Sequence, residues 1–397
     1  MVLKALFWIY VLLGIAYWAA WGWFTRILRR APRAGPEEPG TEGKVPLVLV
    51  LVPARNEERG IEACLRSLLA QEYPRIRILL ADDGSTDGTR AIAESIGAGD
   101  GRLEIVDPGE PPEGWVGKCW ALHRAYEHAR ERGYDDGALL LFTDADVVFH
   151  PRAIPIGVRR LLQERLDLLA LLPRSVHETF WERTVQSAVV HALLVLGTIA
   201  RLYPLRKAPR MASGAFLLVR PEYYRIAGGH HALRHEIIED VALATTVHMR
   251  GGRTGALMAP DLVRVRMYHG LREIWQGWAK NFFAGTGDSL RRASELILVC
   301  LLFWVAPAPL LLFLLGRAGA TGSGWSEAAG AGILWAAMTA VRAAGNRITG
   351  DPPAFALVHP LAGAILIGLL AASAWSRRFG RGALWRGRRY PAPKAAS

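Results

Sequence analysis

The sequence predicts an α/β domain built on a parallel sheet, placed between apolar segments that can cross a membrane. Two observations predict this class. Between residues 45 and 142, apolar strand-like runs alternate with amphipathic helical stretches of ~10–15 residues. Long apolar segments lie near both ends of the 397-residue chain, in which hydrophobic residues make up 51%.

The first segment, residues 1–25, is predicted to be a transmembrane anchor. It runs about 20 residues from Ala5 without a charge, which is enough to cross a bilayer, and it lacks the cleavage site of a signal peptide. Residues 26–44 form a basic linker rich in Pro, Gly and Glu. Its first basic residues place the next domain in the cytoplasm; they are Arg26, Arg29, Arg30 and Arg33.

Strands and helices are expected to alternate through the domain. Strands are predicted at residues 45–52, 75–81, 103–106 and 138–142, followed by an apolar run at 166–172 and a strand at 212–219. Helices are predicted after a turn at 53–56, with Asn56 as N-cap, and at 86–96, 120–132 and 222–227. The segment 235–250 contains Glu239-Asp240 at a predicted helix start. This alternation predicts a parallel sheet.

Two carboxylates one residue apart, Asp144 and Asp146, follow the strand at 138–142. Ligands of open α/β sheets bind at the carboxyl ends of strands. One or two carboxylates with phosphate oxygens are the usual ligands of Mg²⁺. A glycine-rich phosphate cradle and a P-loop lysine are absent, which leaves phosphates to a metal. Two solvated loop acids are the alternative.

Residues 291–376 are predicted to hold C-terminal transmembrane helices. Residues 296–315, interrupted by Pro307 and Pro309, and residues 355–375 are each long enough to span. The apolar stretch 328–340 between them is short, and we expect that it does not span, so that the basic tail at 377–397 stays in the cytoplasm. Residues 180–203 are also long and apolar, but a span there would split the α/β domain, so an interfacial or buried helix is expected.

The net charge of +12 is concentrated beside the apolar segments. That placement favours anionic lipid headgroups over nucleic acid as the partner. The three cysteines are far apart, which excludes a disulfide framework and a zinc-site spacing. His231 and His235 are spaced for one face of a helix, but a pair alone is weak support for zinc.

Four motifs, in this order and spacing, resemble those of family-two glycosyltransferases with the GT-A fold. They are residues 52–58 (Val-Pro-Ala-Arg-Asn-Glu-Glu), 82–87 (Asp-Asp-Gly-Ser-Thr-Asp), 143–146 (Thr-Asp-Ala-Asp, a DxD motif) and 239–240 (Glu-Asp). The resemblance implies a cytoplasmic GT-A domain at residues 45–290. The membrane segments, the Gly-Trp-Val-Gly-Lys stretch at 114–118 and the tail at 380–390 are similar more narrowly to hopene-associated glycosyltransferases, relatives of carotenoid and ceramide glycosyltransferases.

The resemblance also implies roles for individual residues. Pro53, Ala54 and Glu57 would line the uridine pocket, and Asp83 would contact uracil or ribose. Asp144 would face the sugar or ribose, and Ser213 and Gly214 would border the donor sugar. Asp146 would bind Mg²⁺ or Mn²⁺, and Asp240 would be the general base. Glu239 competes for the last role, although acids in a first helical turn also simply favour the helix dipole. Lys118 would meet a phosphate, with a solvated residue at a helix start as the equal alternative.

Relatives carry a Gln-x-x-Arg-Trp-type motif on a later helix that contacts the acceptor or diphosphate. Gln276 and Trp278 match it in type, the arginine is missing, and Lys280 could supply the charge. Packing in a core or at the membrane surface is the favoured alternative for Trp278.

Together these features predict a metal-dependent, inverting hexosyltransferase. It would be a multi-pass protein of the plasma membrane that moves a sugar from a UDP-sugar to a lipid, such as a hopanoid or carotenoid. A carboxylate base and a metal that neutralises the leaving diphosphate suffice for direct displacement. A processive polysaccharide synthase and a non-catalytic membrane protein with a nucleotide-binding domain are the alternatives.

Overall fold

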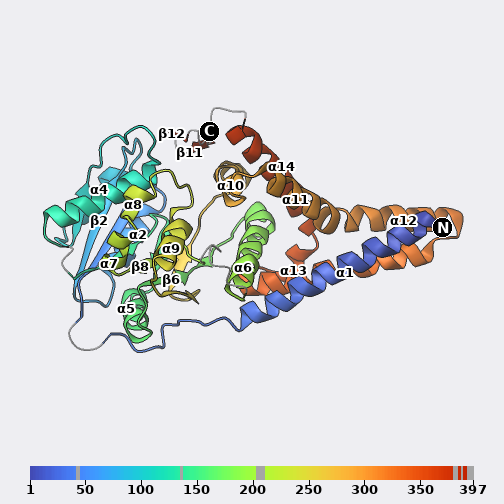
Figure 1. Ribbon diagram of the computed structural model, residues 1–397, viewed down its shortest axis with the longest axis horizontal. Coiled ribbons are helices and arrows are strands. Elements are labelled where there is room, and N and C mark those ends of the chain that lie inside the picture. The colour runs from blue at the N-terminus through green and yellow to red at the C-terminus, as the bar shows by residue number, and fades with distance from the viewer. Residues whose placement is uncertain (42–44, 135–136, 203–210, 379–382, 386–387, 391–397) are drawn as a thin grey trace. The chain divides into compact units, whose positions relative to one another are not determined.

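A computed structural model describes residues 1–41, 45–134, 137–202, 211–378, 383–385 and 388–390 (Figure 1). The chain divides into two compact units. The sheet unit comprises residues 31–176 and 200–267, and the helical unit comprises residues 1–30, 177–199 and 268–397. Each unit is therefore assembled from segments that are far apart in the sequence.

The main sheet has seven strands in the order β3-β2-β1-β4-β8-β6-β9. They are β1 (Val48–Ala54), β2 (Ile76–Asp82), β3 (Leu103–Val106), β4 (Leu139–Phe142), β6 (Leu168–Leu172), β8 (Leu217–Val219) and β9 (Thr254–Met258). Each run predicted to be a strand overlaps one, although β1 and β2 extend past their predicted ends and β8 is shorter than the predicted 212–219. β9 was not predicted.

The sheet is mixed, and the prediction of a parallel sheet is wrong for one strand. β1 to β4 run parallel, as do β6 and β9, but β8 is antiparallel to both of its neighbours, β4 and β6. Leu217 pairs with Phe142 and Val219 with Leu140, so β8 runs back along β4.

Helices cover both faces of the main sheet (Figure 1). Alternate residues of β1 take part in two cores. Val48, Val50 and Val52 pack with α2 (Ile61–Leu69), α3 (Thr89–Gly97) and α5 (Ala153–Gln163), whereas Leu49 and Leu51 pack with α4 (Gly117–Glu131), α7 (Pro221–Ile226) and α9 (Glu239–Met249). Burial on both faces explains why the strands are continuously apolar and do not alternate.

The strands that carry the motifs end at the same edge of the sheet. Ala54 pairs with Asp82 across β1 and β2, and Leu51 pairs with Phe142 across β1 and β4. The loop after β4 then leads into a second sheet of β5 (Val147–Phe149), β10 (Val263–Val265) and β7 (Arg174–Ser175). The segments that follow β1, β2 and β4 are therefore neighbours.

The prediction that Asn56 caps a helix is wrong. β1 continues through Ala54, and α2 begins at Ile61 with Gly60 as its N-cap. Asn56 instead has a φ of 54°, a left-handed conformation that Asn tolerates better than most residues. Its side-chain oxygen accepts a hydrogen bond from the backbone N–H of Thr86 at 2.8 Å. The amide therefore ties together the loops after β1 and β2.

The helical unit contains the segments at both ends of the chain and the segment at 177–199. Its elements are α1 (Val2–Arg29), the π-helix η1 (Glu182–Gln186), α6 (Ser187–Leu202), α10 (Leu271–Gly285), α11 (Leu290–Val299), the π-helix η2 (Cys300–Val305), α12 (Pro307–Thr321), α13 (Trp325–Thr349), the 3₁₀-helix η3 (Pro353–Ala356) and α14 (His359–Arg378). The first two residues of the predicted tail end α14, and the tail is otherwise described only at β11 (Ala383–Trp385) and β12 (Arg388–Tyr390); its other residues lie outside the described part of the chain.

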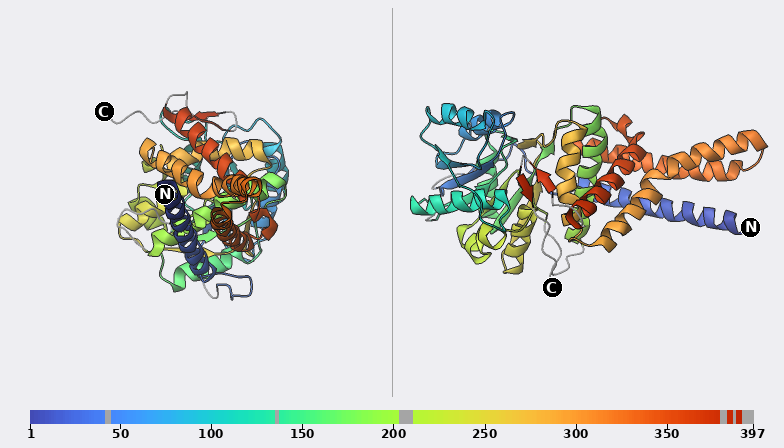
Figure 2. Two further views of the ribbon diagram at one scale, coloured as in Figure 1. Left: turned by 90° about the vertical axis from the view of Figure 1, so that its right-hand side faces the viewer. Right: turned by 90° about the horizontal axis from the view of Figure 1, so that it is seen from above.

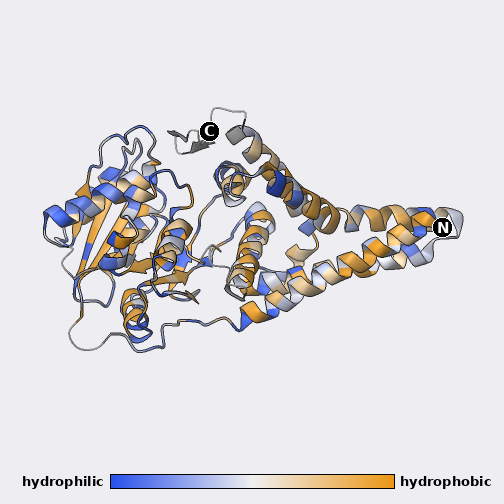
Figure 3. Ribbon diagram, viewed as in Figure 1, coloured by the Kyte–Doolittle hydropathy of each residue, from blue (hydrophilic) through white to orange (hydrophobic). Residues whose placement is uncertain are grey.

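Three helical segments in the described residues are long and apolar enough to cross a membrane: Val2–Arg29, Glu182–Ala200 and His359–Ser376. Leu290–Val305 and Pro307–Thr321 together form a fourth candidate, bent by 43° at the predicted prolines. Figure 3 shows the hydrophobic residues along α1 and α12. These findings agree with membrane segments near both ends of the chain.

Helix α13 is longer than the predicted apolar stretch 328–340. It runs parallel to α1 and packs along it (Figures 1 and 2), because a Cβ on Gly14 would touch Leu334 and one on Gly22 would touch Val341. An ion pair of 3.1 Å joins Lys4 to Glu327 near the start of both helices. The short stretch seen in the sequence is thus the centre of a 25-residue helix whose ends are polar.

Candidate active site

The residues predicted for the uridine pocket come together at the ends of β1 and β2. Pro53 and Ala54 close β1, and the backbone N–H of Asp83 donates to the carbonyl of Ala54 at 2.8 Å. The guanidinium of Arg55 donates to the carbonyl of Asp83. This hydrogen bond joins the loop after β1 to the loop after β2. Asp83 is 5% exposed, which places its side chain inside this edge of the sheet.

Glu57 lies beside the same loops. Its backbone N–H donates to the hydroxyl of Thr89, the first residue of α3, at 2.7 Å. The loop after β1 is therefore held against the helix that follows β2. This contact positions Glu57 without using its carboxylate.

The loop with Asp144 and Asp146 is fixed from two sides. A Cβ on Gly60, the N-cap of α2, would lie 3.2 Å from the Cα of Asp146, so the helix start rests against this backbone. On the other side, the hydroxyl of Thr143 donates to the carbonyl of Ala215 at 2.8 Å. The two carboxylates thus sit on a rigid loop at the carboxyl end of β4, the usual ligand edge of such a sheet.

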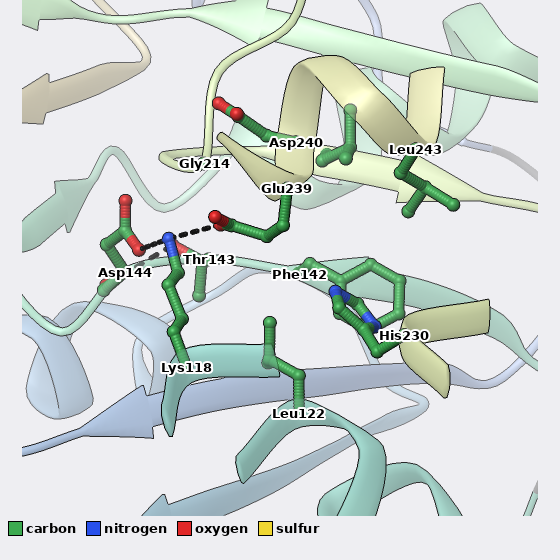
Figure 4. Close-up of a pocket in the computed structure, with 11 residues that line it drawn as sticks. Lys118, Leu122, Phe142, Thr143, Asp144, Gly214, His230, Glu239, Asp240 and Leu243 are labelled. Atoms are coloured by element: carbon green, nitrogen blue, oxygen red, sulfur yellow. Dashed lines mark hydrogen bonds and ion pairs between the residues drawn. The ribbon is translucent and has the colours of Figure 1, made fainter. Parts of the chain in front are cut away.

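Lys118, in the first turn of α4, occupies the centre of the site (Figure 4). Its ammonium Nζ lies 2.5 Å from Oδ1 of Asp144 and 2.6 Å from Oε1 of Glu239. Burial opposes the charged form, but the carboxylates of Asp144, Glu239 and Asp240 outweigh it and raise the pKa of Lys118 well above its ordinary value. Lys118 is therefore more than a helix-start residue in water, because its ammonium bridges two of the motifs.

Gly214 is the residue that allows this bridge. A Cβ at this position would lie 2.6 Å from Oδ2 of Asp144 and 3.1 Å from Nζ of Lys118. A carbon cannot approach a carboxylate oxygen so closely without moving it. Glycine at this position therefore leaves room for the Asp144–Lys118 pair, and the predicted contact of Gly214 with the donor sugar stays a prediction.

Glu239 and Asp240 begin α9, as predicted. Glu239 points at Lys118, whereas the carboxylate of Asp240 lies apart from that ion pair (Figure 4). Burial, and then the negative charge of Glu239, raise the pKa of Asp240 to about 6, although Lys118 opposes the shift. A carboxylate with a pKa near neutrality suits general base catalysis.

These groups surround a small cavity of about 10 Å³ with a polar side and an apolar side. Its lining is Lys118, Leu122, Phe142, Thr143, Asp144, Gly214, Leu217, His230, Glu239, Asp240 and Leu243. The cavity joins Asp144, predicted to face the donor, to Asp240, predicted to be the base. Asp146 and the predicted uridine-pocket residues do not line it, although they lie at the same edge of the sheet.

Sequence reasoning missed His230 as part of this site. The residue lies on the short helix α8 (Gly229–Ala232), and its ring shares a hydrogen bond of 2.8 Å with the hydroxyl of Tyr224. Burial, helped by the charge of Lys118, lowers the pKa of His230 to about 3, so the ring is neutral. No sequence signal pointed to it, because the position depends on how α7 and α8 fold back together.

Gln276, Trp278 and Lys280 lie on α10 in the helical unit. Trp278 is 7% exposed and its indole N–H donates to Oε1 of Gln186 at 2.6 Å. The contact favours the packing role over stacking on a sugar. The predicted roles of Gln276 and Lys280 toward the acceptor stay predictions.

The residues present fit a divalent cation only if a ligand completes the site. Among the described residues, no group of three or more His, Cys, Asp or Glu side chains could hold a metal ion. Asp144 and Asp146 can supply one or two hard oxygen ligands, and Mg²⁺ commonly takes the remainder from substrate phosphates and water. His231, one of the two histidines weighed for zinc, packs edge-on against Trp115, with the ring centroids 5.5 Å apart.

The chain is similar in sequence to known proteins. Residues 49–238 match the sequence model of the family described as glycosyl transferase family 2. The 4,4'-diaponeurosporenoate glycosyltransferase of Staphylococcus aureus strain MRSA252 is 28% identical over 261 residues, which cover 64% of this chain. The match covers 65% of that relative's length.

The fold also matches that of a solved structure. The mannosyltransferase PcManGT from Pyrobaculum calidifontis, in complex with GDP-Man and Mn²⁺, superposes with a TM-score of 0.54 and 19% sequence identity. The superposition covers 95% of this chain and 99% of that chain. The likeness therefore extends beyond the sheet unit.

Proposed function

This chain is a family-two glycosyltransferase with the GT-A fold, and from that premise we propose that it moves a single sugar from a UDP-sugar to a lipid with inversion at the anomeric carbon. The observation that carries the proposal is the cavity where Asp144 and Asp240 meet. One carboxylate follows β4 at the ligand edge of the sheet, and the other has the raised pKa of a base.

The donor would bind across the ends of β1, β2 and β4. Pro53, Ala54, Glu57 and Asp83 would receive the nucleoside, and Asp144 with Gly214 would border the sugar. A nucleotide-sugar donor is supported by the structural neighbour, which was solved with GDP-Man and Mn²⁺. The choice of uridine rests on the resemblance of the motifs.

The residues of this chain would divide the chemistry between them. Asp240 would take the proton from the acceptor oxygen, and that oxygen would attack the anomeric carbon as the bond to the diphosphate breaks. Lys118 would help to balance the charge of the departing diphosphate. Asp146 would hold Mg²⁺ or Mn²⁺, which acts as a Lewis acid on phosphate oxygens when bound. A single displacement needs one base and no covalent intermediate, unlike the paired carboxylates of retaining enzymes.

The acceptor would be a lipid hydroxyl or carboxyl group, as in a hopanoid or carotenoid. Two observations support it: the S. aureus relative is a glycosyltransferase of a carotenoid acid by name, and three or four helical segments can cross a membrane. The protein would then be a multi-pass protein of the plasma membrane with a cytoplasmic catalytic unit. A processive polysaccharide synthase is less well supported, because Trp278 is buried and bonded to Gln186.

The test uses the detergent-purified full chain with Mn²⁺, a panel of UDP-sugars and total bacterial lipid. Mass spectrometry of the lipids should reveal a new glycolipid with wild type and none with Asp240→Asn. Glycosylation of water-soluble acceptors at the same rate would contradict the lipid proposal. Failure to bind any nucleotide sugar would contradict the proposed function as a whole.

A further inference from the structure

The charges of the site are not balanced in the free protein. One ammonium, Lys118, lies between the carboxylates of Asp144 and Glu239, and Asp240 adds a third acid to the same cavity. Leucine side chains and Phe142 line the apolar side. In such a partly enclosed site, removing the cation would leave like charges facing each other at high cost.

The bridge joins two parts of the site with different predicted tasks. Asp144 belongs to the loop after β4, on the donor side, and Glu239 belongs to the start of α9, next to the base. The ammonium lies within 2.6 Å of both. In the donor-free protein, Lys118 therefore acts as the cation of the DxD loop.

Lysine is well suited to leave this position. Its charge is a compact ammonium on a flexible four-carbon stem, with three donors that can rotate. The side chain is 32% exposed, so water and a ligand can reach it. When a divalent cation and a diphosphate bind, the ion pair of Lys118 with Asp144 can break, while the ion pair of Lys118 with Glu239 remains.

We propose that Lys118 is an internal counter-ion that competes with the divalent cation for the DxD loop, so that Mg²⁺ or Mn²⁺ binds well only together with the nucleotide diphosphate. The inference rests on the proposed function and concerns the order in which the divalent cation and the nucleotide bind. Before the donor binds, Asp144 is paired with Lys118. The donor diphosphate supplies new partners for the ammonium and for the metal, and the two ligands then favour each other's binding.

The exchange predicts a specific linkage. The factor by which UDP tightens Mn²⁺ binding must equal the factor by which Mn²⁺ tightens UDP binding. Lys118→Met keeps the length of the side chain and removes the competing charge. We expect Mn²⁺ affinity without UDP to rise at least about 5-fold in this variant, and the enhancement by UDP to fall by a similar factor.

The experiment measures free Mn²⁺ by electron paramagnetic resonance, with the full chain in detergent, with and without UDP. Lys118→Arg keeps the charge and should retain weak metal binding without UDP. Lys4→Met removes a lysine charge from the helical unit, where Lys4 pairs with Glu327, and should leave both affinities unchanged. Thermal unfolding of each variant identifies a loss of folding.

The outcomes separate this inference from the proposed function. If Lys118→Met changes Mn²⁺ affinity by the same factor with and without UDP, the lysine acts only through its field and the exchange is wrong. Unchanged or weaker Mn²⁺ binding in the folded variant without UDP also overturns it. Wild-type protein that binds no UDP under any condition contradicts the proposed function itself.

Discussion

The two units differ in how their ion pairs are balanced. In the helical unit, the buried carboxylates of Glu327 and Asp351 each face one basic side chain, Lys4 at 3.1 Å and His177 at 2.9 Å. In the sheet unit, the ammonium of Lys118 bridges Asp144 and Glu239, and Asp240 adds a third acid to the same cavity. An excess of carboxylates at a strand end favours a cationic ligand there, which supports placing the proposed chemistry in the sheet unit.

The sharpest way to break this comparison is Asp240→Asn. The substitution keeps the size of the side chain and removes the proposed base, so kcat should fall by about 10²- to 10⁴-fold, the usual contribution of a general base. Donor KM should change little. The measurement is steady-state kinetics of glycolipid formation.

The matched control for Asp240→Asn is Glu62→Gln, which removes an exposed carboxylate paired with Arg66 on α2. An exposed pair of this kind contributes ~0–1 kcal/mol, so this variant should behave as wild type. Near-normal turnover in Asp240→Asn would move the role of base to Glu239.

The second prediction concerns Gly214, which lies against the ion pair of Lys118 and Asp144. Gly214→Ala would place a Cβ within 2.6 Å of Oδ2 of Asp144, so the carboxylate or the ammonium must move. We expect donor KM to rise by on the order of 10-fold, which corresponds to about 1.4 kcal/mol. Kinetics with varied UDP-sugar would measure it.

A glycine with open space around it provides the comparison for Gly214→Ala. In Gly101→Ala the new Cβ would have no heavy atom within 4 Å, and the kinetics should stay as in wild type. If Gly214→Ala also leaves donor KM unchanged, the bridge tolerates displacement and does not shape the donor site.

The third prediction is a pH dependence. Asp240 must be deprotonated to act as a base, and its pKa is about 6, so kcat/KM should rise with pH through this value and level off above it. The negative charge of Glu239 raises this pKa. Glu239→Gln should therefore shift the rise to lower pH, and Lys118→Met should shift it to higher pH, since the ammonium lowers the same pKa. Parallel shifts in both variants would show that other groups control the profile.

The sequence predicted well what depends on neighbouring residues. The apolar runs of β1 and β4 could be recognised because both faces of these strands are buried, and the start of α9 at Glu239 matched its prediction. The direction of β8 could not be predicted, because the strand pairs with residues about 75 positions away along the chain and an apolar run does not indicate which way it crosses the sheet.

The same limit applies to the site. Asp144, Gly214, Glu239 and Asp240 were each predicted from motifs, and the structure gathers them around one cavity. The pairing of Lys118 with Glu239 joins residues far apart in the sequence, so it exists only because the tertiary structure brings the first turns of α4 and α9 together. The raised pKa of Asp240 depends on burial in the same way. Motifs identify residues, but the relations between them come from tertiary structure.

The last prediction tests the balanced side of the comparison. Asp351 is 6% exposed, and it accepts hydrogen bonds from His177 at 2.9 Å and from the hydroxyl of Thr349 at 2.7 Å. Asp351→Asn removes the charge that both donors face, so we expect a loss of about 1–3 kcal/mol of stability. Thermal unfolding in detergent would show it as a lower Tm.

Because His177 and Asp351 are hydrogen-bond partners inside the helical unit, the loss of this contact should affect folding and leave the chemistry intact. The kcat of the folded fraction of Asp351→Asn should therefore match wild type, in contrast to Asp240→Asn. Glu295→Gln, which breaks an exposed pair with Arg291 on α11, should change neither Tm nor kcat appreciably. A fall in kcat at unchanged Tm in Asp351→Asn would mean that the helical unit contributes charged groups to the reaction, and charge balance would then no longer distinguish the two units.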